Sequence, residues 1–226
     1  FDPSFTPRKR TALGRAKHEG AAGIVNRDGR YVVYSGDDQR FDYVYKFVTA
    51  GRVDAQNRAA NMGLLDTGTL YVARYNADGS GDWLPLVHGQ GPLTAENGFR
   101  DQGELLVKTR FAAAAVDATR MDRPEGFKAN PVTGRVYAVM TKNAKREPGD
   151  LNPANPRAKN AWGHILELIP PGTGKDADHA ADVYQWDILL LAGDPADPAV
   201  GAKFNPGTSK DDWLVTPDNL ALEWQS

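Results

Sequence analysis

Short strand-like runs separated by turn sequences occupy most of this chain and limit what it can fold into. Two pairs of runs flank compact turns, residues 77–81 and 130–134, which carry Gly with Asp, Asn or Pro. Turns this short favour antiparallel neighbours, so the pattern predicts a mainly β fold. The runs are rich in β-branched and aromatic residues and lie at 30–36, 41–48, 69–76, 82–87, 126–130, 135–141, 164–169 and 183–193.

The segment 104–121 breaks this pattern. Its sequence, ELLVKTRFAAAAVDATRM, is rich in Ala and Leu and has no Gly or Pro, which predicts one helical insertion. The segments 50–67, 142–162 and 194–212 are expected to be long surface loops. The second of them contains Pro148, Pro153 and Pro156, which suit a loop better than a strand.

Composition excludes several classes of partner. The chain has 27 Lys and Arg against 29 Asp and Glu, a net charge of −2, so no strong field draws it to nucleic acid or to an anionic membrane. Apolar runs such as 188–192 are too short to span a bilayer. Cysteine is absent, which excludes disulfides and thiolate metal ligands within this chain. We therefore expect neither nucleic acid nor a membrane as a partner.

A weak internal repeat places acidic residues in equivalent positions. Glu19-Gly20 precedes the turn and run at 29–34, and Glu125-Gly126 precedes those at 134–139. A third, partial copy is expected to begin at Thr216, with Asp218 as its acid. Repeated units of several antiparallel strands suggest propeller blades with long insertions. We expect residues 1–226 to form a single partial β-propeller domain, with about two blades and the start of another.

The repeat has a chemical consequence. The first strand of a propeller blade lines the central channel, so acids at equivalent positions of several blades converge near the axis. Clustered carboxylates repel one another unless a cation neutralises them, and their oxygens suit Ca²⁺ or a hard trivalent ion. Glu19, Glu125 and Asp218 are the candidate metal ligands. Arg123 is placed nearby to bind an oxyanion, although a local ion pair with Glu125 is an equally simple explanation.

Five segments, taken together and in order, resemble the PhoX-type alkaline phosphatases. The resemblance covers most of the chain. It implies a six-bladed propeller that is exported by the twin-arginine route to the periplasm or beyond the cell. It also implies hydrolysis of small phosphate monoesters at an axial cluster of Fe³⁺ and Ca²⁺. The segments are KRTALGRAKHEGAA (9–22), YSGDDQRFDYVYKFV (34–48), GTLYVARYNADGSGDWLPL (68–86), VDATRMDRPEGF (116–127) and NPRAKNAWGHILEL (155–168).

By this resemblance Glu19, Glu125 and Asp218 would bind metal and Arg123 would clamp the phosphate. The chain departs from the family pattern at two points: the cysteine that bridges the irons is absent, and Gly126 replaces the usual Trp after RPE. The chain is expected to be a fragment with an incomplete metal cluster and weak or no turnover by itself. Two other functions remain open, a calcium-dependent lactonase or esterase propeller and a non-catalytic binding platform.

Overall fold

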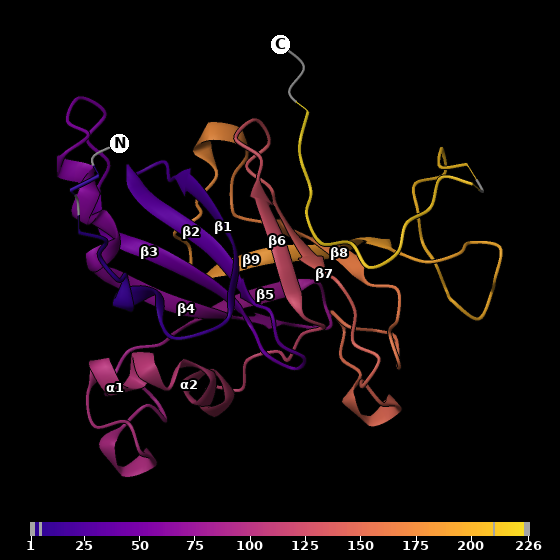
Figure 1. The fold of residues 1–226 in the computed structure, drawn as a ribbon, viewed down its shortest axis with the longest axis horizontal. Coiled ribbons are helices and arrows are strands. Elements are labelled where there is room, and N and C mark those ends of the chain that lie inside the picture. The colour runs from indigo at the N-terminus through magenta and orange to yellow at the C-terminus, as the bar shows by residue number, and fades with distance from the viewer. Residues whose placement is uncertain (1–2, 5, 210, 224–226) are drawn as a thin grey trace.

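In the computed structural model, which describes residues 3–4, 6–209 and 211–223, the chain forms a nine-stranded antiparallel sheet (Figure 1). Its order is β1-β2-β3-β4-β5-β9-β8-β7-β6. The prediction of a mainly β fold is confirmed. The strands are β1 (His18–Val25), β2 (Arg30–Asp37), β3 (Val44–Arg52), β4 (Gly68–Tyr75), β5 (Ser80–Pro85), β6 (Pro124–Ala129), β7 (Val136–Met140), β8 (His164–Ile169) and β9 (Val183–Leu191).

The strands follow the expected runs with two differences. β1 was not among those runs, because its sequence HEGAAGIV is rich in small residues and has few β-branched ones. β3 begins at Val44 and not at residue 41, since Phe41 has a left-handed φ of 68° that a strand cannot continue. Both differences lie at the end of the sheet that carries Glu19.

The sheet folds back on itself into a nearly closed, barrel-like form. β5 pairs with β9 at one side, and at the other side β1 and β2 pass so close to β6 that a Cβ on Gly36 would lie 2.5 Å from Cβ of Pro124. The two antiparallel meanders, β1–β5 and β6–β9, resemble adjacent blade-like units, but the β5–β9 pairing joins them in one sheet. The closed six-bladed ring and the partial-propeller domain over 1–226 stay predictions.

Two hydrophobic cores stabilise this arrangement. β3 contributes side chains to both cores. Val44 and Val48 belong to the core between the meanders, whereas Tyr45 and Phe47 lie on the other face of the sheet and belong to the second core. The inter-meander core also contains Tyr34, Trp83, Phe127, Leu166, Leu168 and Tyr184. The other core lies between the sheet and the helical insertion and contains Leu70, Leu86, Leu93, Leu105 and Ala112.

The helical insertion is shorter than predicted and is divided in two. α1 (Gln102–Val107) and α2 (Thr109–Ala115) replace the single helix expected over 104–121, and they lie beside β4 (Figure 1). Asp101 caps α1 by accepting a hydrogen bond from Glu104 N. The helical path ends because Asp117 has a left-handed φ of 57°, after which the chain returns to the sheet. Short 3₁₀ turns occur at Thr11–Leu13, Ala60–Asp66, Ala95–Asn97, Pro148–Asp150 and Gly174–Asp176.

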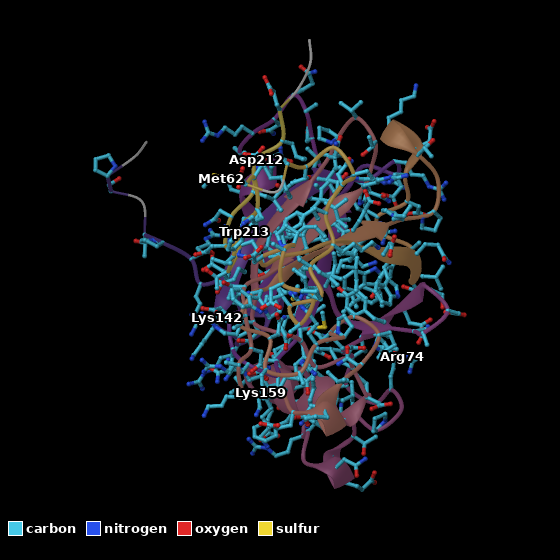
Figure 2. All side chains as sticks on the ribbon, turned by 90° about the vertical axis from the view of Figure 1, so that its right-hand side faces the viewer. Met62, Arg74, Lys142, Lys159, Asp212 and Trp213 are labelled. Carbon is cyan, nitrogen blue, oxygen red and sulfur yellow. The ribbon has the colours of Figure 1, made fainter. Side chains whose placement is uncertain are left out.

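The segment 142–162 is only in part the surface loop that we predicted. Lys142 and Lys159 are exposed on one side of the molecule, as Figure 2 shows. Arg146 and four of its neighbours in the segment are buried, and the side chains of Arg146, Asn155 and Asn160 donate hydrogen bonds to Arg120 or Asp122. The four are Asn143, Ala154, Asn155 and Asn160. Among the described residues, no helix combines the length and apolar character that a membrane span requires.

Candidate active site

The structure brings the three acids of the repeat together. Glu19 comes from β1, Glu125 from β6 and Asp218 from the C-terminal segment, and each offers one carboxylate oxygen that lies within 4.8 Å of the others. Glu125 is buried, Glu19 is half-buried and Asp218 is exposed. Residues far apart in the sequence therefore form one acidic cluster at the point where β1 and β6 begin.

The strand register is irregular at or directly after each strand acid. The register between β1 and β2 shifts between Glu19 and Ala22, and the register between β6 and β7 shifts between Pro124 and Phe127. A bulge bends its strand and turns a side chain away from the regular alternation. Both copies of the repeat thus carry a register irregularity next to the acid that joins the cluster.

The glycine after each acid permits a close approach of backbones. A Cβ on Gly20, which has a left-handed φ of 68°, would lie 3.0 Å from the backbone nitrogen of Phe127. A Cβ on Gly126 would lie 2.6 Å from the carbonyl oxygen of Asp218, and Gly126 N donates a 2.9 Å hydrogen bond to that oxygen. Neither position has space for a side chain in this structure, so the Trp expected after RPE would not fit at Gly126 without movement of the C-terminal segment.

The expected third copy of the repeat contributes its acid without a strand. Within the described residues 211–223 the structure assigns no strand. The segment is held instead by isolated backbone hydrogen bonds, from Gly126 N to Asp218 O, from Thr216 N to Trp162 O at 2.6 Å and from Gly193 N to Leu214 O at 2.9 Å. These bonds keep Asp218 beside Glu125.

Arg123 lies at the edge of the cluster and contacts two carboxylates. Its Nη2 is 2.7 Å from Oδ1 and 2.9 Å from Oδ2 of Asp38, and 3.1 Å from Oε1 of Glu125. The local ion pair with Glu125 is therefore present. The Arg123 side chain keeps a quarter of its surface exposed, so an external ligand can reach it.

Asp38 was not identified from the sequence. It follows β2 directly, and β2 pairs Gly36 with Glu19, so the hairpin register alone places Asp38 close to Glu19. That register was the signal available in the sequence. It was missed because β1 itself was not predicted.

The charge in the cluster is unbalanced. Burial, then the charge of Asp38 and a hydrogen bond to it, raise the pKa of Glu125 to about 8, and Asp218 adds to the rise, while Arg123 opposes it. A carboxyl group in this state keeps its proton at neutral pH unless a cation comes close. The arrangement is thus one that a bound cation would stabilise.

The helical insertion contacts the end of β2 next to the site. Arg110 of α2 donates two 2.6 Å hydrogen bonds to the fully buried carboxylate of Asp37, the residue before Asp38. Such bidentate pairs fix both position and orientation. α2 therefore helps to hold the end of β2 from which Asp38 projects.

The comparisons with known proteins decide the family. The model of the family described as alkaline phosphatase PhoX matches residues 1–225. The chain belongs to the PhoX family. Pseudomonas fluorescens PhoX in complex with vanadate, a transition state analogue, has a similar fold, with a TM-score of 0.91 and 43% sequence identity.

That match covers 98% of this chain but only 40% of the PhoX chain from P. fluorescens. Among the curated proteins, none matches this sequence. The resemblance to PhoX-type phosphatases noted in the sequence is therefore confirmed at the level of family and fold. The chain spans about two fifths of the length of its solved relative.

Proposed function

We propose that the full-length protein is a phosphatase that hydrolyses small phosphate monoesters, and that this chain supplies part of its metal centre and its phosphate clamp. The observation that carries the proposal is the convergence of Glu19, Glu125 and Asp218 beside Arg123. The proposal is supported by the family and by a relative, 43% identical, that was solved with a transition state analogue.

Ca²⁺ and Fe³⁺ are the metals that we propose. Glu19, Glu125 and Asp218 present only oxygen donors, which suit hard cations, and the raised pKa of Glu125 indicates a need for positive charge. Asp38 is a further oxygen donor at the edge of the cluster, where it is hydrogen-bonded to Glu125 and shares Arg123 with it. When bound, such metals neutralise phosphate charge and activate the attacking oxygen. The remaining ligands would come from parts of the protein outside this chain.

Arg123 would bind the phosphate group. Its contacts to carboxylates in the described chain all use Nη2, which leaves the Nη1 and Nε protons to donate to two phosphate oxygens. A guanidinium held in this way stabilises the charge on the equatorial oxygens of the transferring group. Asp38 and Glu125 orient the guanidinium through their contacts with Nη2.

Replacement of Glu125 by Gln in the full-length protein tests the proposal. The amide keeps the size of the side chain but removes a charged ligand, so we expect bound metal to fall and hydrolysis of p-nitrophenyl phosphate to drop by more than about 100-fold. Elemental analysis for iron and calcium and steady-state kinetics measure the two effects. Unchanged metal content and activity would support a non-catalytic propeller, and better turnover of lactones than of phosphate esters would support a lactonase.

We also propose, from the family alone, that the full-length protein works in the periplasm or outside the cell. Fractionation of the producing cells tests this. Recovery of the protein mainly from the cytoplasm would contradict it.

A further inference from the structure

A fully buried ion pair lies directly behind the phosphate clamp. Asp122, the residue before Arg123, accepts a 2.6 Å hydrogen bond from Nε of Arg146, and neither side chain is exposed by more than 1%. Asn160 donates a 2.9 Å hydrogen bond to the other carboxylate oxygen of Asp122. A charged pair that is buried away from water needs hydrogen-bond partners for its charged atoms, because each ion loses its hydration.

Arg146 uses all three nitrogens of its guanidinium to hold nearby groups. Besides Asp122, it donates from Nη2 to Arg120 O at 2.9 Å and from Nη1 to Asp150 O. Its guanidinium carbon also lies 5.1 Å from the centre of the Phe41 ring, a cation–π contact. One side chain thus fixes the backbone at residue 120, the carboxylate at 122 and the aromatic ring at 41.

These contacts join the two segments that carry the clamp. Phe41 N donates to Met121 O and Met121 N donates to Asp42 O, both at 2.9 Å, so the chain after Asp38 runs beside the chain before Arg123. On the other side of the clamp, Thr141 N donates a 3.2 Å hydrogen bond to Arg123 O, so the backbone of Arg123 is also held by the chain after β7.

Arg123 itself has a left-handed φ of 54°, which is unfavourable for a side chain of its size. Such a conformation persists only where the surrounding structure enforces it. The ion pair at the preceding residue and the hydrogen bond to the Arg123 carbonyl are the contacts that enforce it here.

We propose that Asp122 and Arg146 form a positioning pair, which holds Arg123 and Asp38 in the geometry that binds the phosphate group. The hydrogen bonds of Arg146 go to Asp122, Asp150 and Arg120, none of which belongs to the acidic cluster. A buried ion pair is weak evidence for a role in stability, because well-packed apolar residues often do as well. The inference rests on the proposed function, in which Arg123 is the clamp.

The test uses the full-length protein loaded with metal and the variants Arg146→Met and Arg146→Lys. Methionine removes the charge and the three donors, and lysine keeps the charge but cannot reach three acceptors at once. We expect both variants to bind inorganic vanadate about 10- to 100-fold more weakly by calorimetry and to show a matching loss in kcat/KM for p-nitrophenyl phosphate, with metal content unchanged.

The control is Leu168→Ala, which opens a cavity in the inter-meander core away from the clamp and lowers the melting temperature. We expect its affinity for vanadate to equal that of the wild type. Wild-type affinity in Arg146→Lys, the milder variant, would overturn the positioning role and leave the phosphatase proposal intact. A wild-type protein that neither hydrolyses phosphate esters nor binds vanadate would overturn both.

Discussion

The side chain of Arg123 shows how one arrangement can serve as a structural ion pair and as a binding group. Its positive charge lies beside the carboxyl groups of Asp38 and Glu125. Both contacts use Nη2, so the N–H groups on Nη1 and Nε remain for another acceptor. The sequence left these two readings open because they use the same residues. The geometry contains both, and a functional measurement separates them.

We expect Arg123→Met in the full-length protein to lower kcat/KM for p-nitrophenyl phosphate by about 10²- to 10³-fold, since a transition-state donor is lost. Arg135→Met is the matched control, because Arg135 forms a similar pair with Glu167 at 2.8 Å, beyond the β6–β7 turn from the cluster. Its kcat/KM should stay within about twofold of the wild type. Equal losses in both variants would rule out a special role for Arg123.

Lys46 provides a residue-scale prediction about stability. It is fully buried, donates to Ala181 O at 2.6 Å and lies over the rings of Tyr71 and Trp83. Burial lowers its pKa from 10.5 to about 7, although Asp182 and Asp178 oppose the change and Arg30 adds slightly to it. Between these two values the unfolded chain binds a proton that the folded chain does not. Lys46 therefore costs stability as pH falls from about 10 towards 7.

We expect the free energy of unfolding of the wild type, relative to that of Lys46→Met, to rise between pH 7 and pH 9. Denaturant titrations at several pH values within this window measure the difference. The measurements stop at pH 9 because above this value tyrosines that are buried in the folded protein would begin to ionise in the unfolded chain. Two parallel pH profiles would show that Lys46 stays charged in the folded protein.

At the scale of the element, the bulges and glycines of β1 and β6 explain why an acid stands beside a glycine in each copy of the repeat. The strand register shifts directly after Glu19 and around Glu125, and both carboxylates belong to the cluster. The glycine lets a neighbouring backbone come within reach. Both residues of each pair are thus needed to build one site from separate strands.

Gly126→Ala tests this account. The new methyl group would meet the carbonyl oxygen of Asp218 at 2.6 Å, so the C-terminal segment must move. We expect a loss of about 1–3 kcal/mol in stability and weaker binding of Ca²⁺, because Asp218 is displaced. Calcium titration and denaturant unfolding of the full-length protein measure the two effects.

Gly149→Ala is the matched control for this variant. Gly149 has open space around its Cβ position and lies in the 3₁₀ turn Pro148–Asp150. Substitution of Gly149 by Ala should change neither the stability nor the affinity for Ca²⁺. Normal calcium affinity in Gly126→Ala would mean that Asp218 is not held by this contact.

At the scale of the whole molecule, the sheet is closed on itself by contacts that join distant parts of the chain. β5 meets β9, and β1 and β2 meet β6, so the acidic cluster forms only when both meanders are in place. The chain nevertheless spans only 40% of the length of its solved relative. The cluster in this chain is therefore expected to be one part of a larger metal centre.

We expect the 226-residue chain by itself to show weak or no hydrolysis of p-nitrophenyl phosphate, even with added Ca²⁺ and Fe³⁺, while the full-length protein is active. The physical reason is that three carboxylates and one arginine leave a metal cluster short of ligands. Side-by-side assays with equal metal supplements measure this. Robust turnover by the isolated chain would show that its own residues complete the site.

The sequence by itself determined the antiparallel β architecture, because turn residues and β-branched runs are local signals that tertiary contacts rarely reverse. It also indicated Glu19, Glu125, Asp218 and Arg123, since a repeat marks equivalent positions. It did not indicate Asp38, which joins the site through the register of a strand too rich in small residues to be recognised.

Only the tertiary structure decided that the segment 142–162 turns inward, that the insertion ends at Ala115 and that Asp218 joins the other two acids without a strand of its own. These features depend on hydrogen bonds and close approaches between residues far apart in the chain, such as Arg146 to Asp122 and Gly126 to Asp218. Local propensity contains no information about such contacts, because their free energy exists only once both partners are in place.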